Sequence, residues 1–194
     1  GLPLGEANAT QVPRNGLVLW MDALDLDADG NLDELAVGDR VISWTDKITD
    51  KNATQGDLTK QPVKAASGGV SFDGNDVLSV SELNVTAQHI FVVLNGSLGG
   101  TILDRDSTKN VVNFRQLNNG VRKINESSDA ANEKLLNWNT GTVRVSAGSN
   151  DPKGNEAFIL ALTSGNSTVS TGEFSELNLA NSYNGVISEI IFYD

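Results

Sequence analysis

Short apolar runs recur along the chain and are separated by turns rich in Gly, Asn and Asp. Runs of four to eight residues bounded by such turns are typical of β-strands. The runs that predict strands are residues 17–21, 40–44, 69–72, 77–80, 89–94, 101–103, 111–115, 121–124, 142–147, 157–162, 167–171 and 185–193. Only residues 127–136 have a helical composition. The pattern therefore predicts an all-β fold with little helix, built as a two-sheet antiparallel β-sandwich or jelly roll.

The segments between the strands suggest how the domain is organised. Residues 73–76, Asp-Gly-Asn-Asp, have the composition of a hairpin turn between the strands on either side. Residues 46–62 are polar and predict an irregular surface connection. Residues 1–15 are polar with two prolines, and we expect an N-terminal arm or linker. No repeat or boundary divides residues 16–194, so we expect one domain there.

Composition narrows the possible partners and setting. The 194 residues carry a formal net charge of −11, which disfavours binding to nucleic acid or to anionic membranes. No apolar run is long enough to predict membrane insertion. Cysteine is absent, which excludes disulfides, thiolate metal sites and cysteine nucleophiles. The chain begins at Gly1 without Met or a signal sequence, so we expect a mature or excised segment of a larger multidomain protein.

An acidic stretch, residues 25–34 (Asp-Leu-Asp-Ala-Asp-Gly-Asn-Leu-Asp-Glu), contains no Lys or Arg to neutralise it. Its alternating aspartates followed by Gly30 would wrap oxygens around one point, which suits Ca²⁺. The expected ligands are Asp25, Asp27, Asp29, the Asn31 carbonyl, Asp33 and Glu34. An EF-hand is excluded because Ala36 occupies the twelfth position and strands flank the loop. A solvated acidic turn is the alternative, and a structural role for the ion is favoured over a catalytic one.

Several segments together resemble a known superfamily. They are residues 16–23 (GLVLWMDA), 41–47 (VISWTDK), 52–55 (NATQ), 70–74 (VSFDG) and 185–194 (GVISEIIFYD). Their order is similar to that of the concanavalin A-like lectin/glucanase superfamily, in particular bacterial laminin-G-like jelly-roll modules. The resemblance covers the first third of the chain and the final strand. It implies two antiparallel sheets with adjacent first and last strands, in secreted or surface-attached proteins that often bind carbohydrate or mediate adhesion with Ca²⁺.

The superfamily includes glycoside hydrolases, so we looked for their chemistry. A retaining hydrolase needs two carboxyl groups about 5–5.5 Å apart, and neither Glu-x-Asp-x-x-Glu nor Glu-x-Asp-x-Glu occurs in the chain. Glu173 and Glu176 are three positions apart, which places them on opposite faces of a strand. His89 is the only histidine, with no Ser or Asp placed to form a triad. We therefore expect a non-catalytic protein.

Trp20 and Trp44 belong to predicted strands and are expected in the core, so the candidate ligand-binding aromatics are those in loops. Sugar sites combine an aromatic face with polar groups. The candidates are Trp138 and Tyr183 as loop aromatics, and Arg115, Gln116 and Asn119 as polar groups. For each of them a purely structural role, such as a hydrogen-bonded turn, is an equal alternative.

Three functions remain open from the sequence. The first is a Ca²⁺-binding lectin-like module that binds surface glycans, which would show an exposed aromatic near an open ion site. The second is a Ca²⁺-dependent protein- or peptide-binding module of an adhesin, which would show a narrow groove or a free sheet edge. The third is a Ca²⁺-stiffened spacer with closed ion shells. All three place the protein outside the cell.

Overall fold

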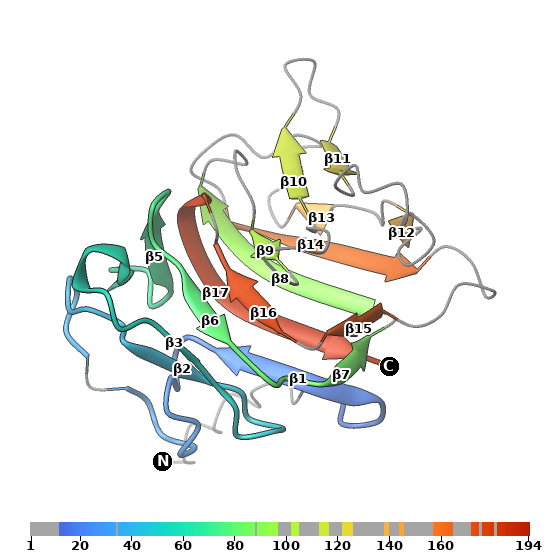
Figure 1. Ribbon diagram of the computed structural model, residues 1–194, viewed down its shortest axis with the longest axis horizontal. Helices are drawn as coiled ribbons and strands as arrows, with labels where there is room; N and C mark the ends of the chain where they lie inside the picture. The colour runs from blue at the N-terminus through green and yellow to red at the C-terminus, as the bar shows by residue number, and fades with distance from the viewer. Residues whose placement is uncertain are drawn as a thin grey trace, which may run out of the picture.

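The computed structural model describes residues 12–33, 35–87, 89–96, 102–104, 113–116, 122–125, 138–139, 144–145, 157–164, 172–174, 176–180 and 182–194. Nearly all regular structure in these segments is strand (Figure 1), which confirms the predicted all-β class. The strands are β1 (Leu17–Asp22), β2 (Ser43–Thr45), β3 (Asn52–Thr54), β4 (Val63–Lys64), β5 (Val70–Asp73), β6 (Leu78–Val80), β7 (Val85–Ala87), β8 (His89–Gly96), β9 (Leu103–Asp104), β10 (Asn113–Gln116), β11 (Arg122–Asn125), β12 (Trp138–Asn139), β13 (Arg144–Val145), β14 (Ala157–Ser164), β15 (Gly172–Phe174), β16 (Leu177–Leu179) and β17 (Asn184–Tyr193). One short 3₁₀-helix, η1 (Leu58–Lys60), is the only helix in these segments.

The strands form two principal antiparallel sheets. The larger has the order β12-β14-β8-β17-β5-β4, with β1 also paired to β17 and β13 to β14. The smaller has the order β2-β3-β6-β16-β9. Two further pairs, β10-β11 and β15-β7, are separate two-stranded sheets. Several neighbouring strands are distant in sequence, as Figure 1 shows for β8 and β17.

Strand β17 organises the larger sheet. It pairs along its length with β8. On its other edge, residues 184–187 pair with β5 and residues 189–193 pair with β1. The register shifts between Ile187 and Glu189. At this irregularity the Ala23 amide donates to the Ser188 carbonyl at 3.0 Å. The first and last strands are thus adjacent, as predicted, and the chain leaves β1 at a fixed point beside β17.

Alternation of apolar residues explains the core. In β1, Leu17, Leu19 and Met21 are buried while the residues between them are half-buried. The same period of two holds for the buried Ile90 and Val92 of β8, because successive side chains of a strand point to opposite faces. One buried hydrophobic cluster draws residues from both principal sheets. Burial of this cluster is the main favourable term in folding.

The hairpin predicted at residues 73–76 is wrong. Strand β5 pairs with β17 and β4 in the larger sheet, whereas β6 pairs with β3 and β16 in the smaller one. The turn is tight, because Asp73 accepts from the Asn75 amide at 2.8 Å and Asp76 accepts from the Asp73 amide at 2.9 Å. A turn of this composition can connect strands of two different sheets as well as the two strands of a hairpin.

Two other expectations change. The strand expected at residues 40–44 is shorter and shifted to Ser43–Thr45, since Arg40 makes only an isolated bridge to Val63 and Ile42 is exposed. Residues 46–62, expected to be irregular, contain β3 and η1. The expected helix at residues 127–136 lies outside the described residues.

Within the segments that the structure describes, no helix is both long enough and apolar enough to span a bilayer.

Candidate metal centre

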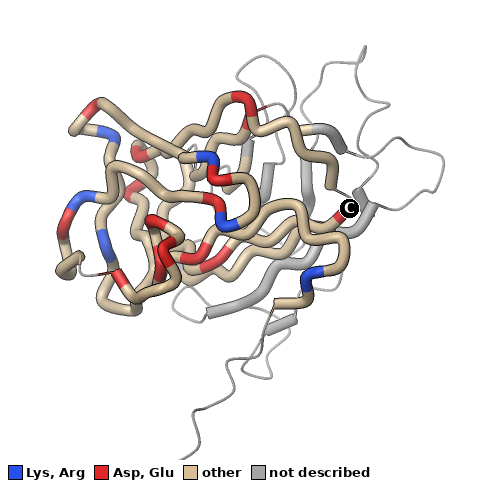
Figure 2. The backbone as a smooth tube through the Cα atoms, turned by 90° about the horizontal axis from the view of Figure 1, so that it is seen from below, with Lys and Arg blue, Asp and Glu red and all other residues tan. Residues whose placement is uncertain are grey.

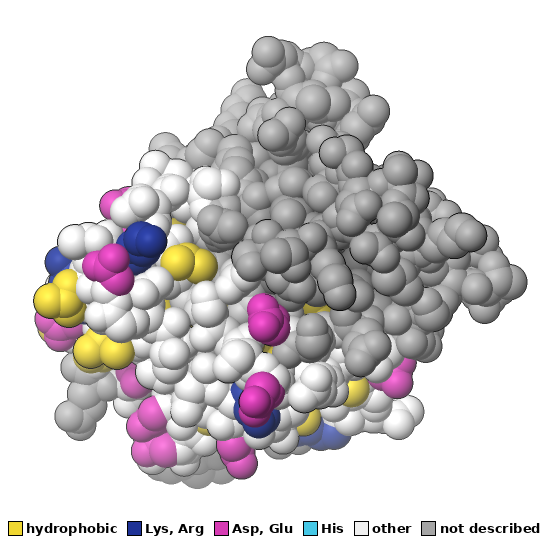
Figure 3. Space-filling view, viewed as in Figure 1, with side chains coloured by type: hydrophobic (Ala, Val, Ile, Leu, Met, Phe, Trp, Pro, Cys, Tyr) yellow, Lys and Arg dark blue, Asp and Glu magenta, His cyan; other side chains and the backbone are white. Residues whose placement is uncertain are grey.

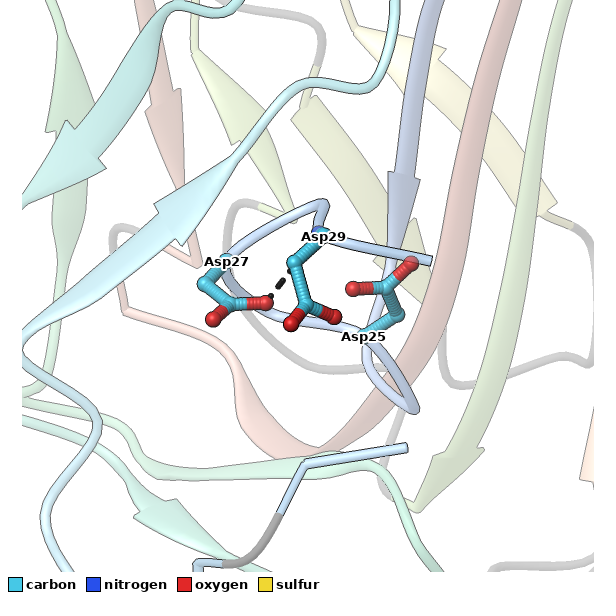
Figure 4. Close-up of side chains that lie close together, drawn as sticks. All are labelled: Asp25, Asp27 and Asp29. Atoms are coloured by element: carbon cyan, nitrogen blue, oxygen red, sulfur yellow. Dashed lines mark hydrogen bonds between the residues drawn. The ribbon is translucent and has the colours of Figure 1, made fainter. Parts of the chain in front are cut away.

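The acidic loop that follows β1 brings three carboxylates together. One oxygen each of Asp25, Asp27 and Asp29 lies within 4.8 Å of the others. Figure 4 shows an Asp25 carboxylate oxygen directed toward the Asp29 carboxylate, with Asp27 beyond it. Asp25 is only 4% exposed, whereas Asp27 and Asp29 lie at the surface. The alternating spacing therefore converges on one point, as the sequence predicts.

The loop backbone fixes this arrangement. Gly30 has φ +89°, a left-handed conformation that glycine adopts without steric cost. The Gly30 amide donates to Asp25 Oδ2 at 3.1 Å, and the Asp29 amide donates to Asp27 Oδ1 at 3.2 Å. The Asn31 amide donates to Asp29 Oδ1 at 2.7 Å. Each aspartate thus orders a nearby amide of the loop while it presents oxygen to the cluster.

The other predicted ligands have different placements. The cluster does not include Asp33, whose carboxylate instead accepts a hydrogen bond from the Leu26 amide and closes the base of the loop. The side chain of Asn31 donates to Asp29 Oδ2 at 3.1 Å. Glu34 lies outside the described residues. Asp33 was expected to coordinate because its sequence position fits, but its side chain satisfies a backbone donor.

Lys47, which the sequence pattern does not single out, lies beside the loop. Its Nζ is 2.8 Å from Asp25 Oδ2 and 2.9 Å from Asp22 Oδ2. Burial alone would raise the pKa of Asp25, but the Lys47 hydrogen bond and charge, with the loop amides, hold it below its usual value. Burial would lower the pKa of Lys47, and Asp25 and Asp22 raise it above its usual value. The charge of Asp25, the buried member of the cluster, is therefore partly neutralised by Lys47, which lies outside residues 25–34.

A second missed residue, Asp46, holds Lys47 in position. Asp46 is fully buried and accepts from the Trp20 amide at 2.7 Å and the Thr49 amide at 2.9 Å. The Lys47 amide in turn donates to the Trp20 carbonyl at 2.8 Å. The turn after β2 is thereby fastened to β1 and to the acidic loop. The only sequence signal for this pair was its place in the Trp-Thr-Asp-Lys segment.

The donor set fits a hard divalent cation. Carboxylate oxygens are the ligands that Ca²⁺ and Mg²⁺ prefer. Asp25 Oδ1 is buried and has no hydrogen-bond partner among the described residues. Asp27 and Asp29 form no ion pair with any described residue. Figure 2 shows acidic positions on many turns of the described backbone, with basic positions interspersed. Two of the three clustered carboxylates thus still lack a counter-charge.

For three of the predicted ligand-binding residues the structure gives a strand position. Trp138 is in β12, opposite Ser164 of β14. Arg115 and Gln116 are in β10, which pairs only with β11 among the described strands. Asn119 lies outside the described residues. The structure therefore leaves a site at Trp138, Arg115 and Gln116 untested.

The prediction that Tyr183 binds a ligand is wrong. This residue was expected as an exposed loop aromatic, but it is fully buried, so no surface ligand can reach it. It lies just before β17 and joins the core cluster. Trp44 is fully buried as expected. The half-buried Trp20 ring is covered by Lys47 Nζ at 4.5 Å and Arg14 Cζ at 4.9 Å from its centroid, so it offers no open platform.

The Tyr183 hydroxyl predicts a stabilising substitution. It has no hydrogen-bond partner among the described residues, and burial raises its pKa. An unsatisfied buried hydroxyl costs about 1–3 kcal/mol. We expect Tyr183→Phe to raise the free energy of unfolding by about 1 kcal/mol in urea denaturation, with Tyr193→Phe, which loses a bond to the Pro13 carbonyl, as the contrasting variant. A loss of stability in Tyr183→Phe would show that the hydroxyl is satisfied.

Exposed large hydrophobic side chains are aliphatic in the described part of the chain. They are Leu24, Leu32, Leu35, Val37, Ile42 and Leu58. Figure 3 shows hydrophobic side chains, in yellow, at the edge of the face that it draws. The exposed aromatic expected beside the ion of a lectin therefore does not come from these residues.

No protein-family model, curated protein or solved structure matches this chain.

Proposed function

We propose that this chain is a non-catalytic Ca²⁺-binding module of a secreted or surface-attached bacterial protein, with a lectin-like, concanavalin A-like jelly-roll sandwich as its framework. The observation that carries the proposal is the convergence of Asp25, Asp27 and Asp29 within 4.8 Å. The two principal antiparallel sheets and the adjacent β1 and β17 agree with the framework that the resemblance implies.

Calcium suits this cluster better than magnesium for a geometric reason. Ca²⁺ accepts six to eight oxygens in flexible geometry, whereas Mg²⁺ demands a near-ideal octahedron. The loop offers three carboxylates of unequal exposure, with Asp27 and Asp29 at the surface. The remaining coordination positions would face solvent, where water or the hydroxyl groups of a glycan would complete the shell. An open shell of this kind favours a ligand-binding module over a spacer.

Calcium titration tests the ion. We expect calorimetry to show one binding event at the loop, and excess EDTA to lower the melting temperature by several degrees. Ligand at a hundredfold excess over its dissociation constant adds about 2.7 kcal/mol of stability. Asp27→Asn with Asp29→Asn should abolish both effects, because the three-carboxylate cluster is lost.

The control for that double variant removes two exposed negative charges elsewhere. Asp50→Asn with Glu82→Gln changes the net charge equally and leaves the acidic loop intact. We expect it to bind calcium and to respond to EDTA like the unmodified chain. Equal melting curves with and without EDTA for the unmodified chain would contradict the ion site.

The ligand class needs a separate experiment. A glycan array with and without calcium tests the lectin-like function, and calcium-dependent binding of any glycan supports it. Peptide binding is the second candidate, because Phe91, Ile191 and Tyr193 line an apolar groove that also contains Glu189.

A further inference from the structure

The outer face of the larger sheet carries a groove that the ion site does not use. Three cross-strand pairs of β8 and β17 form its floor, and all six residues are half-buried. The pairs are His89–Tyr193, Phe91–Ile191 and Val93–Glu189. The residues between them, such as Ile90 and Phe192, are fully buried in the core. The floor thus faces away from the core and is apolar over most of its length.

The groove has a defined wall and volume. Val12, Pro13 and Asn15 also line the groove, and the Tyr193 hydroxyl donates to the Pro13 carbonyl at 2.9 Å. The rings of Phe91 and Tyr193 meet edge to face at 6.0 Å. The volume is about 660 Å³, which is within the range of ligand pockets.

An acidic pocket continues the groove at its Glu189 end. Its volume is about 250 Å³, and it shares Val93 and Glu189 with the groove. Its other lining residues are Asp22, Leu24, Ser67, Gly68 and Ser188. Among the described residues that line the groove or the pocket, none is Lys or Arg. An apolar channel therefore leads into a pocket that carries carboxylates without a basic residue in its lining.

Glu189 is the carboxylate best placed to receive a cation. Its Oε1 accepts from Trp20 Nε1 at 2.8 Å, which holds the side chain in place. Asp22, its cross-strand neighbour on β1, is already paired with Lys47. Burial raises the pKa of Glu189 and the Asp22 charge adds to the rise, whereas the Trp20 hydrogen bond and the Lys47 charge oppose it. A cation in the pocket would stabilise the ionised carboxylate.

We propose that this groove binds an extended peptide segment whose apolar side chains lie on Phe91, Ile191 and Tyr193 and whose Lys or Arg enters the pocket at Glu189. Alternate side chains of an extended peptide point the same way about 6.8 Å apart, which matches the two-residue steps between the three floor pairs. The proposal does not depend on the calcium site, since Asp25, Asp27 and Asp29 line neither the groove nor the pocket.

Charge and chemistry favour this occupant over three others. A glycan needs several convergent polar groups, and the groove floor is mainly apolar. The chain's own residues 1–11 contain Glu6 and no Lys or Arg side chain that could enter the pocket. A second copy of the chain would bring another net charge of −11, which opposes self-association.

The test is a titration of the full chain, followed by amide NMR, with the peptide acetyl-Leu-Thr-Phe-Thr-Lys-amide. We expect saturable shifts at the β8 and β17 amides. A peptide with neutral norleucine in place of Lys should bind about tenfold more weakly, because it cannot form the charge-assisted hydrogen bond to Glu189. No shifts at these strands up to about 5 mM peptide, a concentration at which weak complexes still form, would overturn the proposal, as would equal binding of both peptides.

Variants locate the peptide. Glu189→Gln keeps an acceptor for Trp20 and should remove the preference for Lys over norleucine. Ile191→Thr, a β-branched replacement, should weaken both peptides, whereas Ile42→Thr, at an exposed apolar position outside the groove, should weaken neither. Unchanged binding in Glu189→Gln and Ile191→Thr would overturn the assignment.

Further arms separate the alternatives. The peptide should bind equally well in calcium and in EDTA. Peptide binding can therefore be observed even if the calcium titration shows no ion site. Loss of binding in EDTA would place the peptide at the ion and overturn the groove site. Stronger peptide binding after deletion of residues 1–11 would identify the chain's own arm as the occupant. Equal shifts with a neutral disaccharide, or a dimer disrupted by Ile191→Thr, would likewise overturn the peptide proposal.

Discussion

Replacing Asp46 by Ala is expected to remove about 3 kcal/mol or more of the free energy of unfolding. Asp46 is fully buried and accepts from the Trp20, Ile48 and Thr49 amides. Each buried donor left without a partner costs about 1–3 kcal/mol. The carboxylate also joins β1 to the turn that carries Lys47, so its loss should loosen the acidic loop.

Urea denaturation and calcium calorimetry measure the two consequences of this change. In Asp46→Ala we expect a lower unfolding midpoint and weaker calcium binding, because Lys47 and the loop lose their common anchor. Asp50→Asn, at an exposed position in the same turn, is the matched control and should change neither quantity by much. A stability loss below about 1 kcal/mol in Asp46→Ala would mean that water replaces the carboxylate at little cost.

The strands of the core could be predicted because their pattern is local. Apolar residues at every second position of β1 identify a strand buried on one face, and the structure confirms that alternation. Pairing between strands could not be predicted in the same way. The turn at residues 73–76 has hairpin composition, yet β5 and β6 belong to different sheets because each finds a distant partner in β17 or β16. Partner choice depends on the packing of the whole core.

The acidic cluster shows the same limit. The spacing of Asp25, Asp27 and Asp29 predicted their convergence, since they are close in sequence. Lys47 was missed because it reaches the loop from another turn, 25 residues beyond Asp22. Asp33 was misplaced because a carboxylate of suitable position can equally satisfy a backbone amide.

The groove was hidden in the sequence by an apolar run. Residues 90–94 are apolar at every position, which predicts a strand buried on both faces. In the structure Ile90, Val92 and Leu94 are fully buried, whereas Phe91 and Val93 are half-buried on the opposite face. Hydrophobicity alone does not distinguish a face covered by the core from one that lines a binding groove. The neighbouring Glu189 makes the distinction, but it becomes a neighbour of Val93 only through the pairing of β17 with β8.

Lys47→Met is expected to destabilise the chain strongly without calcium and much less with it. Asp25 is 4% exposed, and Lys47 is its only ion-pair partner among the described residues. Removing one member of a buried ion pair costs about 3–5 kcal/mol because it leaves a charge uncompensated. Calcium bound by Asp25, Asp27 and Asp29 would supply that compensation in place of Lys47.

Melting curves of Lys47→Met and the unmodified chain, each with calcium and with EDTA, measure this exchange. By linkage, the variant should show the larger drop in melting temperature on chelation and the tighter calcium binding, since calcium no longer shares Asp25 with an ammonium group. Lys60→Met, at an exposed position in η1, should respond to EDTA like the unmodified chain. If Lys47→Met loses the same stability with and without calcium, the ion and Lys47 do not act on the same carboxylate. The Asp25 cluster would then be a structural network that Lys47 alone neutralises.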